Sequence, residues 1–110
     1  MKKTSLTAAL AIATLAGCAG HDPVDHVTYR NEPLVKQVEH GMTADQLLTI
    51  GGPPSTQVQR QAQAGTCNNY VLNNDGHEQT YYVTLDSSGR VDGKGFNTCE
   101  HIDEHQRRYR

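Results

Sequence analysis

The sequence predicts an α+β domain of two layers, in which a helical hairpin packs on a three-stranded antiparallel sheet. Two observations predict it. Residues 33–54 carry apolar residues at helical spacing between capping and stop signals, whereas residues 67–99 alternate with a period of two between turn signals. A helical region followed by a strand region is typical of an α+β domain, and the expected order is αα-βββ.

The first helix is expected to begin at Pro33 and to end at Gly41. Proline suits the first turn of a helix because its missing N–H needs no partner there, and glycine suits the stop. Leu34, Val35 and Val38 have the spacing of one helical face. These residues therefore predict a short amphipathic helix.

A second short helix is expected after Thr43. Thr43 and Gln46 fit a capping box, in which the hydroxyl and the amide each satisfy a free backbone N–H. The apolar face consists of Leu47, Leu48 and Ile50. The run Gly-Gly-Pro-Pro at residues 51–54 ends this helix, and the two helices form the hairpin.

Three strands are expected after a glutamine-rich connector at residues 57–63. They cover residues 67–72, 79–86 and 90–99, and the turns between them are "NNDG" at 73–76 and "DSSG" at 86–89. Asparagine, aspartate and glycine favour turns because they tolerate positive φ angles. The third strand is weakened by Gly93 and Gly95.

The first 17 residues have the pattern of a bacterial lipoprotein signal peptide. Lys2 and Lys3 are followed by an uncharged apolar run over residues 6–15, which is shorter than the roughly 20 residues of a membrane-spanning helix. The next residues, Leu-Ala-Gly-Cys at 15–18, resemble a lipobox, so Cys18 is expected to receive lipid and to become the first mature residue. The alternative is an ordinary secreted protein with a cysteine at that position.

Lipid on Cys18 would make attachment effectively permanent. One acyl chain holds a protein only marginally, whereas a lipoprotein cysteine carries two or three. Ala19 follows the cysteine, in place of the aspartate that commonly retains lipoproteins at the inner membrane. The expected location is therefore the outer membrane, with the domain facing the periplasm.

The mature chain is expected to hold one domain. Residues 18–32 are expected to form a lipidated N-terminus with a flexible tether, residues 33–100 the domain and residues 101–110 a polar tail. Loss of Lys2 and Lys3 with the signal peptide leaves eight basic residues against twelve acidic ones, a net charge of minus four. No nucleic-acid partner is expected, since proteins that bind nucleic acids usually carry a basic excess.

Two cysteines remain if Cys18 carries lipid. Cys67 and Cys99 form an even pair, and a structural disulfide between them suits an oxidising compartment. The alternative is a redox pair or a metal site, but there is no C-x-x-C and no zinc-type ligand cluster close to either cysteine. In a simple meander the two would lie at opposite ends of the strands. A bridge then needs a bend, a bulge at the glycines or a different pairing of the third strand.

The segments "GMT", "LL" and "GGPPS", followed by a three-stranded meander behind a lipobox, resemble the BamE-like (SmpA/OmlA) family of small outer-membrane lipoproteins. The similarity runs from about Leu34 to Cys99, and the paired cysteines indicate an osmotically inducible branch of the family. The resemblance implies the αα-βββ fold, a role in envelope integrity or assembly, and a link to osmotic stress. It implies no enzyme activity.

Two groups of residues are candidates for contact with a partner protein. Gly41, Met42 and Thr43 form one group, although stopping one helix and capping the next explains each residue type. Tyr81 and Tyr82 form the other. Because successive residues of a strand point to opposite faces, one tyrosine is expected in the core with Val83 and Leu85, and the other exposed among threonines. An exposed tyrosine suits a partner contact.

The segment "HIDEH" at residues 101–105 matches the H-x-x-E-H pattern of inverzincin metalloproteases. Only five residues follow it, and none is a suitable third ligand. If the tail were helical, its histidines and Glu100 and Glu104 could hold a metal loosely, but a solvated polar tail explains them better. No metal, no cofactor and no catalytic residue is therefore expected.

The expected function is that of a non-enzymatic outer-membrane lipoprotein that contacts another envelope protein, with homo-oligomerisation left open. One alternative is an inhibitor or binding module for a periplasmic enzyme, for which the turn at residues 73–76 is the candidate. A DNA-binding regulator is a further alternative. The signal peptide and the acidic mature chain both speak against it.

Overall fold

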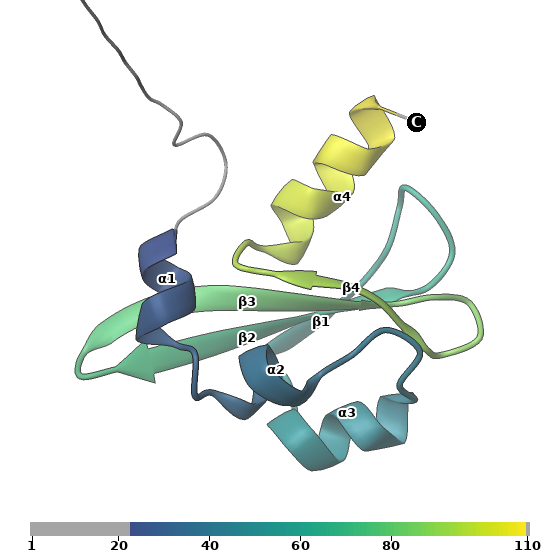
Figure 1. The fold of residues 1–110 in the computed structure, drawn as a ribbon. Helices are drawn as coiled ribbons and strands as arrows, with labels where there is room; N and C mark the ends of the chain where they lie inside the picture. Colours follow the sequence, from purple (N-terminus) through teal and green to yellow (C-terminus); the bar gives the residue numbers. More distant parts are fainter. Residues whose placement is uncertain (1–22, 110) are drawn as a thin grey trace, which may run out of the picture.

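The computed structural model describes residues 23–109. The expected signal peptide, Cys18 and the first residues of the expected tether lie outside this part of the chain, so their interpretation stays a prediction. In chain order the elements are α1 (Pro23–Thr28), α2 (Pro33–Gln37), α3 (Ala44–Gly51), β1 (Thr56–Gln59), β2 (Thr66–Asn74), β3 (His77–Leu85), β4 (Val91–Gly95) and α4 (Cys99–Arg108), all drawn in Figure 1.

The α+β class is confirmed, but the sheet has four strands in place of the three expected. Their order is β1-β2-β3-β4, and each neighbouring pair is antiparallel. β1 comes from the segment that was expected to be a connector, and it pairs with the first half of β2. Its side chains are mostly exposed and polar, so backbone pairing forms this strand without the apolar alternation that marks the others.

Two helices, α2 and α3, form where the hairpin was expected and contact each other, but the first is shorter than expected. α2 ends at Gln37 and not near Gly41, because Val38 is extended, with φ −73° and ψ 130°, and its side chain is fully buried. α3 begins as predicted. Thr43 Oγ1 accepts the N–H of Gln46 at 3.1 Å, and the N–H of Thr43 donates to Gln46 Oε1 at 2.9 Å, which completes the capping box.

One face of the sheet carries the hydrophobic core. Tyr81, Val83 and Leu85 are all buried there, as the period of two predicts. The core cluster further contains Tyr29, Leu34, Val38, Leu47, Tyr70, Leu72 and Val91. α2 and α3 lie on one side of the sheet in Figure 1, and both contribute side chains to this core.

The opposite face is covered by a helix that the sequence analysis missed. Residues 101–110 are not a polar tail as expected, because residues 99–108 form α4. Thr98 caps this helix, since its Oγ1 accepts the N–H of His101 at 3.1 Å. Figure 1 shows α4 on the other side of the sheet from α2 and α3. The sheet therefore lies between two helical layers.

Candidate functional site

The turn at Gly41, Met42 and Thr43 is held by the connection between β3 and β4. The N–H of Gly41 donates to Val91 O at 2.8 Å, and the N–H of Val91 donates to Met42 O at 2.8 Å. The guanidinium of Arg90 donates to Gly41 O at 2.8 Å. Gly41 has φ +91° and is exposed, whereas Met42 packs against the core. These contacts give each residue a structural role, so this turn is the weaker candidate for a partner contact.

The neighbouring turn at residues 86–89 forms as predicted. Asp86 Oδ1 accepts the hydroxyl of Ser88 at 2.7 Å and the N–H of Arg90 at 3.1 Å. These hydrogen bonds, from Ser88 first and then from Arg90, hold the pKa of Asp86 below its usual value. The ionised carboxylate therefore fixes the loop against which the Gly41 turn rests.

Tyr81 and Tyr82 point to opposite faces of β3. Tyr81 is 2% exposed, and burial raises the pKa of its phenol to about 12. Tyr82 is half-buried on the other face, and burial raises the pKa of its phenol as well. A Cβ atom at Gly95 would lie 3.1 Å from the Tyr82 ring. Because Gly95 has no side chain, the Tyr82 ring can pack closely over β4.

A cleft of about 470 Å³ opens beside Tyr82. β4 ends opposite Tyr82, so within residues 23–109 no strand pairs with the outer edge of β3 from His77 to Tyr81. The walls include His26 from α1, Tyr82 and Phe96 from the sheet side, and His101, Ile102 and His105 from α4. We refer to this hollow as the α1–α4 cleft.

Phe96 connects the walls of the α1–α4 cleft. Its ring centroid lies 4.8 Å from that of Tyr81, 4.9 Å from that of His26 and 5.8 Å from that of Tyr29. The contacts with Tyr81 and His26 are edge-to-face, the arrangement that aromatic rings prefer. The cleft is therefore lined by a packed aromatic cluster that continues into the core.

α1 closes part of the uncovered edge of β3 by polar contacts. The amide of Gln79 donates to Asp25 Oδ2 at 2.8 Å, and its oxygen accepts the N–H of Thr80 at 3.1 Å. Directly after α1, Tyr29 Oη donates to His77 O at the start of β3, at 2.5 Å. An unpaired strand edge invites pairing with another chain, and the Gln79 amide protects it by accepting the N–H of Thr80. From Pro23 onward the chain is thus part of the fold, so the expected tether over residues 18–32 is too long.

The turn at residues 73–76, on which the inhibitor alternative depends, is the tip of the β2–β3 hairpin. Asp75 and Gly76 have positive φ angles of 56° and 85°, as a two-residue hairpin turn requires. The amide of Asn74 donates to Thr28 O at 2.8 Å. The tip is therefore attached to α1, although its side chains are exposed.

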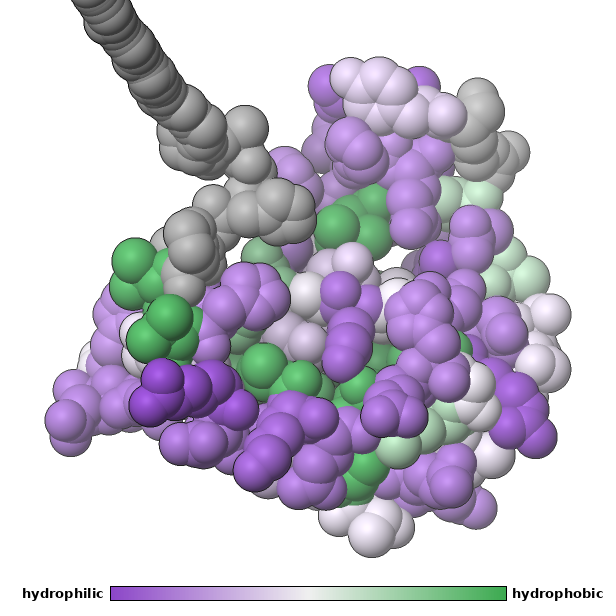
Figure 2. Space-filling model, viewed as in Figure 1, coloured by the Kyte–Doolittle hydropathy of each residue, from purple (hydrophilic) through white to green (hydrophobic). Residues whose placement is uncertain are grey.

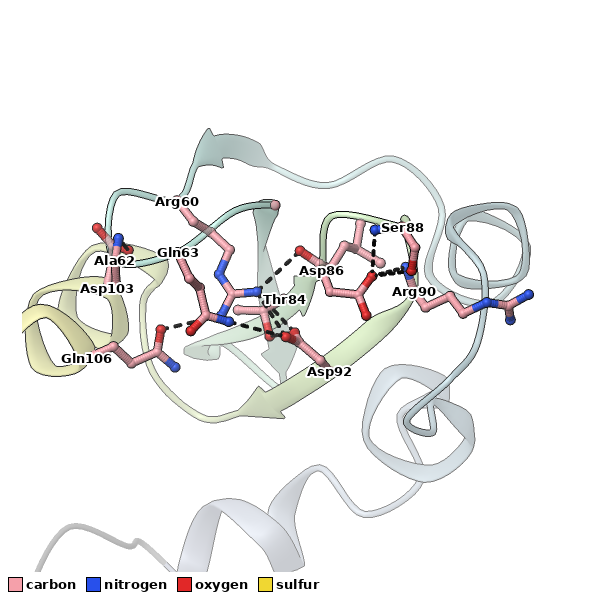
Figure 3. Close-up of polar contacts among 12 residues, drawn as sticks. Arg60, Ala62, Gln63, Thr84, Asp86, Ser88, Arg90, Asp92, Asp103 and Gln106 are labelled. Carbon is pink, nitrogen blue, oxygen red and sulfur yellow. Dashed lines mark hydrogen bonds and ion pairs between the residues drawn. The ribbon is translucent and has the colours of Figure 1, made fainter. Parts of the chain in front are cut away.

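A polar network fixes α4 over the sheet (Figure 3). Arg60 is 6% exposed, and its Nη1 lies 3.1 Å from both carboxylate oxygens of Asp92. The guanidinium also donates to Leu85 O at 3.2 Å and to Gln106 Oε1 at 3.4 Å. Asp92 in turn accepts the hydroxyl of Thr84 at 2.6 Å. One arginine therefore connects the loop after β1, the β3–β4 pair and α4.

The disulfide between Cys67 and Cys99 joins α4 to β2, with Cα atoms 5.7 Å apart. β4 ends at Gly95, and the chain then turns toward the face that α4 covers before α4 begins at Cys99 (Figure 1). The N–H of Cys99 donates to Asn69 Oδ1 at 2.8 Å. The early end of β4 removes the geometric conflict that a third strand over residues 90–99 would create.

Sequence reasoning missed several residues that shape this site, namely Phe96 and the network residues Arg60, Asp92, Asp103 and Gln106. Asp103 Oδ1 accepts the N–H groups of Gln61 and Ala62 at 3.0 and 2.9 Å. Such contacts between distant segments leave no periodic signal. α4 itself had a periodic signal in the sequence, because oppositely charged residues occur four positions apart at 103 and 107 and at 104 and 108.

Across residues 23–109, no three His, Cys, Asp or Glu side chains are grouped so that they could hold a metal ion. His105 packs against Tyr109, with ring centroids 4.7 Å apart. Over the same residues, no helix combines the length and the apolar character needed to cross a bilayer.

Comparison with known proteins identifies the family. The family model described as the outer membrane protein assembly factor BamE domain matches residues 27–95. The chain belongs to the BamE family. OsmE of Escherichia coli strain K12, which is named as an osmotically inducible lipoprotein, is 38% identical over 99 residues, or 89% of this chain and 87% of OsmE. OsmE of E. coli O157:H7 gives the same values.

A solved structure supports the same assignment. A crystal structure of an OsmE lipoprotein is 50% identical, with a TM-score of 0.76, over 81% of this chain and 94% of that chain. The resemblance stated from the sequence is thereby confirmed. The BamE family match extends from α1 to the end of β4, so α4 lies outside it.

Proposed function

We propose that this chain is a non-enzymatic lipoprotein of the outer membrane, anchored through lipid on Cys18 and facing the periplasm. It contacts another envelope protein and so acts in envelope integrity or assembly, with a link to osmotic stress. The observation that carries this proposal is the BamE family match over residues 27–95, together with the similarity to OsmE over 89% of the chain.

The α1–α4 cleft is the proposed contact site. Its volume of about 470 Å³ falls in the range of sites that bind small ligands or the side chains of a partner loop. Aromatic side chains such as Tyr82 and Phe96 are enriched at protein interfaces because they bury a large area with few rotatable bonds. The Tyr82 phenol is protonated at neutral pH, as that of any tyrosine without an unusually low pKa is, and it can donate a hydrogen bond to a partner.

The anchor is tested by replacing Cys18. We expect the Cys18→Ala variant to lose the acyl chains and to be absent from the outer-membrane fraction, because attachment to that membrane depends on those chains. Mass spectrometry of the N-terminal peptide and fractionation of the envelope measure both effects. The Ala19→Asp variant is the matched control, and it should keep the lipid but move to the inner membrane. A free Cys18 thiol in the wild-type protein would contradict the proposal.

A further inference from the structure

α1 has an inverted polarity for a surface helix. Its acidic residue Asp25 is 3% exposed, whereas Val24 and Val27 are 64% and 61% exposed. The two valines are three positions apart and therefore share one side of the helix. Figure 2 shows hydrophobic side chains gathered over α1. A surface helix in water normally places its apolar side toward the core and its charged residues outward.

The burial of Asp25 on α1 is explained by its contact with the uncovered edge of β3. Asp25 holds Gln79, and Gln79 in turn accepts the N–H of Thr80 on the uncovered edge of β3. Neither Val24 nor Val27 belongs to the hydrophobic core cluster, so packing in the core does not account for the exposed side of α1. Side chains of this kind are favoured on the outside of a helix where the surroundings are themselves apolar.

The position of the lipid indicates what those surroundings are. Five residue steps separate Cys18 from Pro23, and such a segment spans at most about 18 Å in any conformation. If Cys18 carries its acyl chains in the bilayer, α1 cannot move farther than this from the membrane surface. The tether is therefore too short to let the domain stand away from the lipid.

We propose that α1 lies on the membrane surface, with Val24 and Val27 inserted into the interfacial layer of the lipid. The inference rests on the proposed lipidation of Cys18, and it extends that proposal by fixing which side of the domain faces the bilayer. Insertion of a short helix with two valines is weak by itself. The acyl anchor holds the helix close to the surface, so its high local concentration makes the contact persistent.

Tryptophan fluorescence tests this contact in the full lipidated protein. The chain contains no tryptophan, so each variant carries a single probe. Val24→Trp and Val27→Trp place the probe on α1. Leu48→Trp and Val71→Trp are matched controls, because these residues are also apolar and exposed, at 52% and 51%, but lie on α3 and β2. Each variant is reconstituted in phosphatidylcholine vesicles with and without brominated acyl chains.

We expect brominated lipid to quench both α1 probes and their emission to shift to shorter wavelength, while the two control probes keep their fluorescence. Equal quenching at all four positions, or none at α1, would overturn the inference. If α1 is not quenched in the vesicles, and a cross-linker on α1 attaches to another protein in intact cells, these valines belong to a protein contact and the inference is overturned. Flotation of the vesicles distinguishes failure of the proposed lipid anchor from failure of the proposed α1 contact. A protein that does not float with the vesicles lacks the lipid anchor, whereas a protein that floats without quenching at α1 lacks the contact.

Discussion

Replacing both Cys67 and Cys99 by Ala lowers the free energy of unfolding by about 3–4 kcal/mol. The bridge closes a loop with a sequence separation of 32 residues, and its loss returns that much chain entropy to the unfolded state. The two sulfurs are also what ties α4 covalently to β2. Urea unfolding followed by circular dichroism measures the loss, and hydrogen exchange of residues 99–108 should rise more than that of α3.

Reduction of the wild-type protein supplies the control for this prediction. A reductant should lower the stability of the wild-type chain to that of the double variant and leave the variant unchanged. Double replacement avoids a single free thiol, which would form bridges between molecules. If the double variant unfolds at the same urea concentration as the wild type, the disulfide does not stabilise the fold.

Replacement of Asp92 by Ala should cost about 2–3 kcal/mol of stability. It leaves the buried guanidinium of Arg60 without its carboxylate, and an unpaired buried charge is strongly unfavourable. The side chain of Asp92 is 29% exposed, so water can compensate part of this loss. The effect should be largest at α4, because Arg60 also donates to Gln106. Equilibrium unfolding of the purified protein measures it.

The Glu104→Ala variant is the matched control for Asp92. Glu104 also pairs with an arginine, Arg108, at 3.0 Å, but both side chains are more than half exposed. Its removal should cost less than about 0.5 kcal/mol. A second comparison adds Arg60→Met to the Asp92→Ala variant, which removes the unpaired charge and should restore part of the stability. Equal losses for Asp92→Ala and Glu104→Ala would contradict the role given to the network.

Features with local causes could be predicted from the sequence. The capping box of Thr43 and Gln46 depends on residues three apart in the chain, and it forms as expected. Tyr81, Val83 and Leu85 enter the core because alternation along a strand needs no knowledge of its partners. The family resemblance also rested on such local segments. It is confirmed by the match over residues 27–95.

Features that depend on distant polar contacts could not be predicted in this way. α4 is held to the loop after β1 by Asp103 and Gln106 and to β2 by the disulfide, so its buried side shows almost no apolar period. Thr98 and the charge pairs four residues apart were its only local signals. β1 is a polar edge strand, so its sequence also lacks the apolar alternation by which a strand can be predicted.

The α1–α4 cleft could not be predicted from the sequence, because it depends on where the helices and strands end. It forms where β4 ends at Gly95, between a helix that precedes the sheet and one that follows it. Tyr82 was found as a candidate by alternation alone. Its neighbours Phe96 and His101 lie in segments that were expected to be a strand and a solvated tail.

The most direct test of the proposed partner contact is photo-cross-linking in intact cells with the lipidated protein. A photoreactive phenylalanine analogue replaces His101, an exposed residue in the wall of the cleft. Thr49, exposed on α3, is the control position, and Ala44, exposed beside the Gly41 turn, tests the weaker candidate. Mass spectrometry identifies the attached protein. We predict an adduct with another envelope protein from His101 and none from Thr49. Adducts only with other copies of the chain, or an adduct from Ala44 but not from His101, would contradict the cleft as the contact site.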